Sequence, residues 1–193
     1  MPQTVKIIQP GTLIDEPMAF KNIYLEFFPR LFVFARTIVK EKALAEDVVE
    51  EVFLKLWENR KLLPTIKNPA YYLFVATKHA CLNALQKQKR VTSIAWDHVD
   101  EQFYFSLSSP ETEMMSKENL RLIEDAFSSL PARCRLIFYL VKEENLRYRE
   151  IAQILDISVK TVEAQMTIAF KRISQQLSKS MPFEMKHIRY RRG

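Results

Sequence analysis

The chain has 193 residues, a length that fits one ordinary domain or two small ones, and 48% of them are hydrophobic, enough for packed cores. Lysine and arginine number 29 against 23 aspartate and glutamate, and the resulting net charge of +6 favours an anionic partner, nucleic acid or a membrane surface. The two glycines, Gly11 and Gly193, lie near the ends, which excludes the glycine-dependent phosphate loop, dinucleotide fingerprint and nucleophile elbow.

The sequence also predicts a cytoplasmic protein with no membrane segment, metal site or cofactor. No apolar run approaches the roughly twenty residues that span a bilayer, and the N-terminus lacks the basic start and long apolar stretch of a secretion signal. Cys81 and Cys134 lie far apart within helical apolar patterns, so we expect two buried thiols. His79, His98 and His187 have no second ligand at helical or finger spacing, which argues against zinc.

Two helical blocks are predicted. The first covers residues 17–90 and follows an N-terminal tail, residues 1–16. Residues 91–114 contain Ser, Asp and Pro without a sustained period and are interpreted as a linker. The second block covers residues 115–180 and precedes a basic tail, residues 181–193. The predicted fold class is therefore all-α, with two small helical domains joined by a flexible linker, and their mutual arrangement is left open.

Helix boundaries in the first block follow from its prolines and capping residues. Pro29 is interpreted as the first turn of a helix over LFVFARTIV. The next predicted helix opens in KEKALAED and runs through VVEEVFLKLWENR. The segment KLLPTIKNP is predicted to be a loop, with Asn68 as the N-cap and Pro69 in the first turn of the helix that follows.

A helical wheel of residues 45–59 has one acidic face with a leucine in its middle. The core arc carries Val48, Val49, Val52, Phe53, Leu56 and Trp57. The acidic face carries Asp47, Glu50, Glu51, Leu54 and Glu58. The simplest interpretation is a solvated face with one stray leucine. However, an exposed apolar side chain ringed by carboxylates is also typical of a surface that docks on a basic protein.

The helix over residues 71–87 places a polar stripe beside its apolar arc. The arc is formed by Phe74, Val75, Cys81, Leu82 and Leu85, and the stripe by Tyr72, His79, Asn83, Gln86 and Lys87. An aromatic ring, amides and a cation suit single-stranded nucleic acid, although ordinary amphipathic helices show the same pattern. The preceding loop adds Lys61, Lys67 and Asn68, whose turn chemistry suits the grip of an everted base.

The strongest local pattern is a helix-turn-helix in LRYREIAQILDISVKTVEAQMTIAFKRI, preceded by a helix that starts at Ser129 or Leu130, before Pro131. After a short first helix, Asp156-Ile157-Ser158 forms the link and Ser158 caps the last helix. The outward residues expected at DNA are Ser158, Lys160, Thr161, Glu163, Ala164, Thr167, Ile168 and Lys171. Small and polar residues followed by cations suit a helix that lies in the major groove of DNA. The alternative interpretation is a helical hairpin with a purely structural role.

These segments, taken together, resemble a known family. AEDVVEEVFLKLWE followed by NPAYYLFVATKHACLNAL resembles region two of sigma factors of the extracytoplasmic-function (ECF) type. LPARCRLIFYLVKEENLRYREIAQILDISVKTVEAQMTIAFKRI resembles their region four, and both matches occur in the family's order across about three quarters of the chain. The phenylalanine-rich, glycine-poor composition is similar to that of sigma factors of the Bacteroidetes.

The resemblance implies a non-enzymatic protein that binds core RNA polymerase and directs promoter-specific transcription initiation. Asp47, Glu50, Glu51 and Leu54 would dock on the clamp helices of the largest polymerase subunit. Residues expected at the minus-ten element are Lys61, Lys67, Asn68, Tyr72, His79, Asn83 and Gln86, and the last helix would read the duplex minus-thirty-five element. An anti-sigma factor is a further expected partner.

Three residues depart from the family's pattern. Asn often stands where this chain has His79, and Gly usually stands where it has Asn145 and Asp156. Because Asn and Asp tolerate left-handed backbone conformations better than most residues, we expect both turns to survive.

Three alternative functions each leave part of the sequence unexplained. A stand-alone helix-turn-helix regulator leaves the acidic helix unused, and an interaction protein such as an anti-sigma factor or adaptor leaves the basic C-terminal half unused. A nucleic-acid-processing enzyme lacks a carboxylate pair, a nucleophile dyad or a metal cluster.

Overall fold

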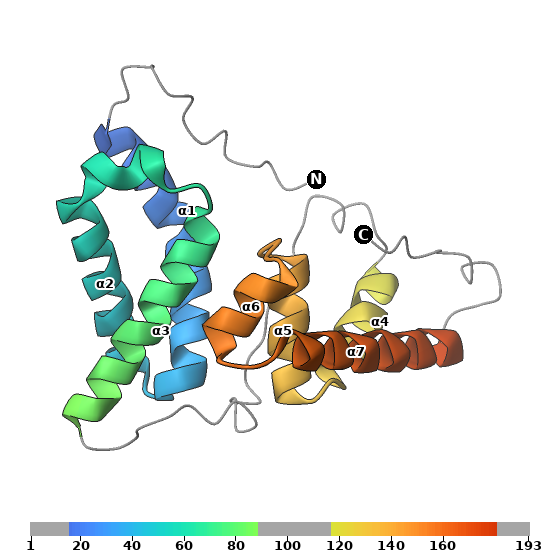
Figure 1. Cartoon of the computed structure of the whole chain (residues 1–193). Helices are drawn as coiled ribbons and strands as arrows, with labels where there is room; N and C mark the ends of the chain where they lie inside the picture. Colours follow the sequence, from blue (N-terminus) through green and yellow to red (C-terminus); the bar gives the residue numbers. More distant parts are fainter. Residues whose placement is uncertain (1–15, 89–116, 181–193) are drawn as a thin grey trace.

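The computed structural model describes residues 16–88 and 117–180, and the chain is helical throughout these ranges (Figure 1). The N-terminal module contains α1 (Glu16–Val39), α2 (Lys42–Glu58), the 3₁₀ helix η1 (Arg60–Thr65) and α3 (Pro69–Lys87). The C-terminal module contains α4 (Lys117–Ser128), α5 (Ala132–Lys142), α6 (Tyr148–Leu155) and α7 (Val159–Ser180). The predicted all-α class is confirmed for the described residues. The predicted linker and basic tail lie outside them, as does the N-terminal tail except Glu16, and the domain bounds stay a prediction.

The N-terminal module is a bundle in which α1, α2 and α3 all pack against one another. The predicted core arc of α2 is buried, with Trp57 partly so. Aromatic rings fill the space between α1 and α2: the Tyr24 ring meets the Phe53 ring edge-on at 4.8 Å, and the Phe20 ring meets the Trp57 ring at 4.9 Å. Such pairs add to the stabilisation from burial alone, which fixes how α2 is held and which of its faces points outward.

Pro29 does not start a helix, contrary to the sequence interpretation. It lies inside α1, which runs without interruption from Glu16 to Val39. A proline within a helix leaves the carbonyl four residues earlier, here that of Leu25, without its backbone donor. Both Pro29 and Leu25 are exposed, so solvent is available on that side of α1. The apolar residues on the opposite side hold the two halves of the helix on one core.

The start of α3 is formed as predicted. Asn68 is the N-cap, its Oδ1 accepting a hydrogen bond from the Tyr71 backbone N–H at 3.1 Å, and Pro69 occupies the first turn. The segment before it is only partly a loop, because residues 60–65 form η1, closed by the Leu62 N–H donating to the Asn59 carbonyl at 2.8 Å. The tight turn of η1 thus occupies most of the connection between the end of α2 at Glu58 and the cap at Asn68.

In the C-terminal module, α7 packs against α4, α5 and α6. Ser158 caps α7 as predicted, with its Oγ accepting from the Thr161 N–H at 3.0 Å. The predicted start of α5 at Ser129 or Leu130 is wrong by one or two residues, because Pro131 holds the N-cap position. Ser129 instead lies in the turn directly after α4, where its Oγ donates to the Ala126 carbonyl at 2.7 Å.

Both turns that carry Asn or Asp in place of glycine adopt the left-handed conformation. Asn145 and Asp156 each have φ of 51°, which confirms the expectation that these residue types preserve the turns. The Ile157 N–H donates to the Ala152 carbonyl at 3.0 Å across the turn between α6 and α7. A third left-handed residue, Lys40 with φ of 64°, joins α1 to α2 and was not anticipated.

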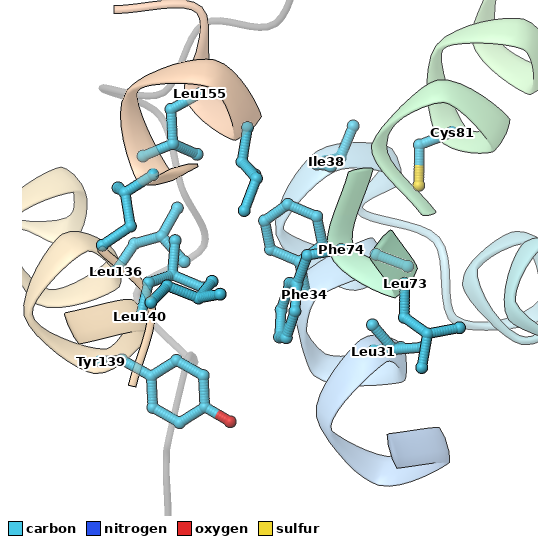
Figure 2. Close-up of a cluster of buried hydrophobic side chains, with 14 of the residues drawn as sticks. Leu31, Phe34, Ile38, Leu73, Phe74, Cys81, Leu136, Tyr139, Leu140 and Leu155 are labelled. Carbon is cyan, nitrogen blue, oxygen red and sulfur yellow. The ribbon is translucent and has the colours of Figure 1, made fainter. Parts of the chain in front are cut away.

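The two modules share one hydrophobic core. Phe34 of α1 and Phe74 of α3, both fully buried, meet edge-on with ring centroids 5.0 Å apart. The cluster continues from them to Leu136, Leu140 and Leu155 of the C-terminal module, as Figure 2 shows. Helix α6 lies against α3 at this junction. The described residues of both modules therefore form a single packed body.

The strained turn at Lys40 gives a stability prediction. A left-handed conformation costs a residue with a Cβ about 1–2 kcal/mol, and glycine avoids most of that cost. We expect Lys40→Gly to raise the free energy of unfolding by about 0.5–1 kcal/mol, measured by urea denaturation. Lys21→Gly, in the interior of α1, is the matched control and should lower it by about 1 kcal/mol. A loss of stability in Lys40→Gly would contradict the strain at this turn.

Candidate functional site

The acidic face of α2 (Asp47, Glu50, Glu51, Leu54 and Glu58) is exposed as a whole. Leu54 retains 58% of its surface exposed, and because α1 and α3 cover the other side of α2, neither covers this leucine. Lys55 donates to Glu51 at 2.5 Å, and this hydrogen bond lowers the pKa of the Glu51 carboxyl. The face thus combines one projecting apolar side chain with exposed carboxyl groups, which is an arrangement suited to docking.

The predicted minus-ten residues lie along η1 and one side of α3. Tyr72, His79, Asn83 and Gln86, hereafter the α3 stripe, are exposed, as are Lys61 and Lys67 before the helix. Tyr72 is 43% exposed, and an exposed aromatic residue is suited to stacking on an unpaired base. Asn68 differs from the others because it is half-buried and already hydrogen-bonded. The helical spacing places the four residues of the α3 stripe on one side of α3.

The predicted duplex-reading face belongs to α7, and most of it faces solvent. Exposed members of this face are Ser158, Lys160, Glu163, Ala164, Thr167, Ile168 and Lys171, with Thr161 half-buried. The opposite side of the helix buries Val162, Met166 and Ala169, as the sequence predicts. Ile168 is 39% exposed, which is unusual for so large an apolar side chain. Such a side chain on this face suits contact with an apolar group such as a thymine methyl.

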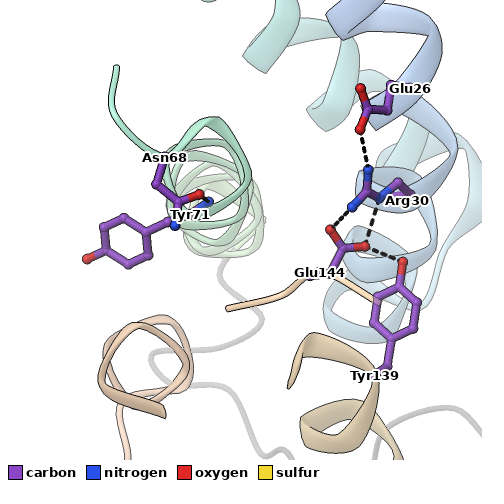
Figure 3. Close-up of polar contacts among 6 residues, drawn as sticks. All are labelled: Glu26, Arg30, Asn68, Tyr71, Tyr139 and Glu144. Carbon is purple, nitrogen blue, oxygen red and sulfur yellow. Dashed lines mark hydrogen bonds and ion pairs between the residues drawn. The ribbon is translucent and has the colours of Figure 1, made fainter. Parts of the chain in front are cut away.

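A fourth group of residues, which sequence reasoning missed, joins the two modules. Arg30 of α1 donates its Nε–H to Glu144 at 2.8 Å and pairs with the same carboxylate through Nη2 (Figure 3). Glu144 also accepts a hydrogen bond from the Tyr139 hydroxyl, and Arg30 holds Glu26 at 3.0 Å. Lys78 forms an ion pair with Asp156. Lys78 gave a weak signal in the sequence, a cation on the apolar arc of a helix, whereas Arg30 and Glu144 gave none.

Burial controls the electrostatics at this junction. Burial in itself lowers the pKa of Arg30, but the hydrogen bond and charge of Glu144 outweigh it, so the pKa is raised and the guanidinium stays charged. Burial and the neighbouring Glu144 carboxylate both raise the pKa of Tyr139, which keeps its hydroxyl a donor. Burial likewise raises the pKa of Glu143, with Glu144 adding to the shift.

The remaining predictions concern thiols, metals and membranes. Cys81 and Cys134 are buried free thiols, as expected, and burial raises their pKa to about 12 and about 11, which makes both unreactive. Within the described ranges, no three metal-ligating side chains converge. None of the described helices has the length and apolarity that crossing a membrane requires.

Comparison with known proteins relates these surfaces to a family. Residues 23–91 match the family model "Sigma-70 region 2" and residues 120–173 match "Sigma-70, region 4". The ECF RNA polymerase sigma factor SigM of Bacillus subtilis is 27% identical over 149 residues, 73% of this chain and 84% of the relative. The ECF RNA polymerase sigma-E factor of Escherichia coli strain K12 is 29% identical over 140 residues, 68% and 72% of the two chains. The acidic face and the α3 stripe fall within the first matched range, and the exposed face of α7 within the second.

Proposed function

Since this chain is an ECF sigma factor, which binds core RNA polymerase and directs promoter-specific transcription initiation, we propose that its three exposed surfaces divide that task among them. The acidic face of α2 docks on polymerase, the α3 stripe captures unwound DNA, and the outer face of α7 binds duplex DNA. The protein has no catalytic residues of its own and works in the cytoplasm beside its polymerase. A resemblance to Bacteroidetes sigma factors stays a prediction.

The observation that carries the docking role is the exposure of Leu54 among carboxylates. A leucine at 58% exposure gains free energy when a partner covers it, and the surrounding Asp47, Glu50 and Glu51 favour a basic partner over DNA. The partner proposed for this face is the clamp helices of the largest polymerase subunit. A stand-alone regulator is not favoured, because that function would not explain why residues 23–91 match sigma region 2.

The proposed minus-ten site divides its task between η1 and α3. Lys61 and Lys67 hold phosphates, while Asn68 and the α3 stripe meet unstacked bases. Tyr72 supplies a stacking surface, and His79, Asn83 and Gln86 supply groups that can hydrogen-bond base edges. Support for this division comes from the exposure of both lysines and of all four residues of the α3 stripe.

For the minus-thirty-five element, the proposed contacts follow the length of α7. Ser158 and Thr161 lie at its N-terminus, where phosphates are bound readily, and Lys160 and Lys171 hold the backbone on either side. Glu163, Ala164, Thr167 and Ile168 face the base edges between them. An anti-sigma factor is the partner expected to regulate the protein.

Run-off transcription tests the proposal directly. With purified bacterial core polymerase and a pooled promoter library, the wild type should yield discrete transcripts, while Leu54→Glu should yield none and should not co-elute with core. Its melting temperature should stay unchanged, because Leu54 contributes little to the core. Leu25→Glu is the matched control, since Leu25 is 62% exposed on α1 and has no assigned role. Full activity of Leu54→Glu would remove the acidic face from the docking surface.

Stacking on Tyr72 is tested by capture of single-stranded DNA. Loss of an aromatic platform costs about 1–3 kcal/mol per base, so Tyr72→Ala should weaken holoenzyme binding to the non-template strand of a selected promoter by roughly tenfold or more. Tyr72→Phe keeps the ring and should bind like the wild type. Fluorescence anisotropy provides the measurement. Equal affinities for all three proteins would show that Tyr72 does not stack on a base.

A salt titration tests the role of Lys160. If it holds a phosphate, Lys160→Ala should weaken binding to every duplex and reduce the slope of log affinity against log salt by about 0.9. Lys21→Ala is the control, because Lys21 is exposed on α1 in the other module. An unchanged slope in Lys160→Ala would remove this residue from the phosphate contacts.

A further inference from the structure

A second leucine of the N-terminal module is exposed, outside the three surfaces described above. Leu62 lies in η1, and 56% of its surface is exposed, nearly the same fraction as for Leu54 on α2. A single exposed leucine is common on protein surfaces and indicates no function by itself. What it can bind depends on how firmly the side chain is held and on the charges that surround it.

The backbone of Leu62 is held on both sides. Its N–H donates to the Asn59 carbonyl at 2.8 Å, and its carbonyl accepts a hydrogen bond from the Thr65 hydroxyl at 2.7 Å. The next residue, Leu63, is 6% exposed and belongs to the core, and η1 contacts both α1 and α2. Pro64, also within η1, has a fixed φ. Leu62 is therefore presented by a rigid turn.

Arg60 fixes the start of the same turn to the end of α2. Its guanidinium lies over the Trp57 ring, 4.6 Å from the centroid, and its Nη1 donates to the Trp57 carbonyl at 3.2 Å. The Trp57 ring in turn meets the Phe20 ring of α1 at 4.9 Å. Because these contacts tie η1 to both neighbouring helices, a side chain on η1 can press against another molecule while the turn keeps its position.

The charges around Leu62 differ from those around Leu54. From residue 59 to residue 88 the sequence contains no aspartate or glutamate, and the cations of this stretch are Arg60, Lys61, Lys67, Lys78 and Lys87. Two carboxylates border it, because Glu58 ends α2 and Glu150 of α6 accepts a hydrogen bond from Asn68. An exposed apolar side chain in this cationic stretch favours an anionic partner, whereas Leu54 among carboxylates favours a basic one.

Among anionic partners, DNA that is being unwound offers a binding place for an apolar side chain. Opening a base step uncovers the apolar faces of the bases, and leucine is one of the side chains that proteins insert between bases to separate them. In this module η1 leads into the first turn of α3, which carries the exposed ring of Tyr72. Leu62 and Tyr72 therefore lie at the same end of the bundle (Figure 1).

We propose that Leu62 is an apolar wedge that enters the base stack at the edge of the unwound segment and helps to open the promoter. This inference rests on the proposed function, because it adds a residue to DNA capture by the N-terminal module. Lys61 and Lys67 hold the phosphates beside the wedge, and Tyr72 stacks on a base that the wedge has separated from its neighbour. The wedge thus acts on opening, whereas the α3 stripe acts on DNA that is already open.

Strand opening by the holoenzyme tests the wedge. A promoter that yields a transcript with the wild type is prepared as two templates, one fully paired and one mismatched over the minus-ten element so that it is open from the start. Opening of the paired template is followed over time by the permanganate reactivity of unpaired thymines. Transcripts are then compared between the two templates.

Leu62→Ala should open the paired template at least about tenfold more slowly than the wild type, because a methyl group is too short to enter the stack. It should transcribe normally from the mismatched template, co-elute with core polymerase and keep wild-type helicity. Leu62→Met retains a long apolar side chain and should open the paired template at the wild-type rate. Leu25→Ala is the matched control, since Leu25 is 62% exposed on α1, and should also behave like the wild type.

Three results would overturn the wedge while leaving the proposed function intact. A wild-type opening rate in Leu62→Ala would show that the leucine does not enter the stack. An equal loss on both templates would place its role after opening, and loss of co-elution with core would place Leu62 in the polymerase docking surface. If the wild type transcribes from neither template, the proposed function fails and the wedge fails with it.

Discussion

The N-cap at Asn68 is the constraint on which the arrangement of surfaces depends. It fixes where α3 begins, and a helix with a fixed start presents each residue in a fixed direction. One side of α3 buries Leu73, Phe74 and Cys81 in the N-terminal core. A second side, through Tyr71 and Lys78, meets α6, and a third carries the α3 stripe. Packing, contact between modules and proposed DNA capture therefore share one helix and one register.

Charge is sorted in this protein by the partner that each face meets. The net charge is positive, yet the carboxylates of α2 gather around Leu54, and three carboxylates of the C-terminal module, Glu144, Glu150 and Asp156, contact α1 and α3. Acidic groups on the duplex-binding side of α7 are limited to Glu163 among its exposed residues. Because a carboxylate repels phosphate, this distribution leaves the proposed DNA surfaces with few groups that oppose DNA binding. The acidic surfaces are suited to contacts with protein instead.

Features set by local sequence were predictable. The caps at Asn68 and Ser158, the exposure of Leu54 and the left-handed turns at Asn145 and Asp156 each depend on a few neighbouring residues, and all five are as predicted. The helix start predicted at Pro29 was wrong because local sequence shows only that proline favours the first turn of a helix. The cost of a proline inside a helix depends on whether the carbonyl that loses its donor faces solvent, which is set by the tertiary structure. The family motifs identified the fold and the function. The roles of individual site residues remain predictions.

The contact between the modules lay beyond sequence reasoning for a physical reason. Arg30 and Glu144 look like ordinary surface charges in the sequence, and only their pairing, across 114 residues of chain, compensates for the burial of Glu144. Phe34 and Phe74 already lie in the N-terminal core, so closing the modules extends that core without creating a second one. The junction therefore combines an apolar centre with paired charges, and the charges fix the geometry in which the two modules meet.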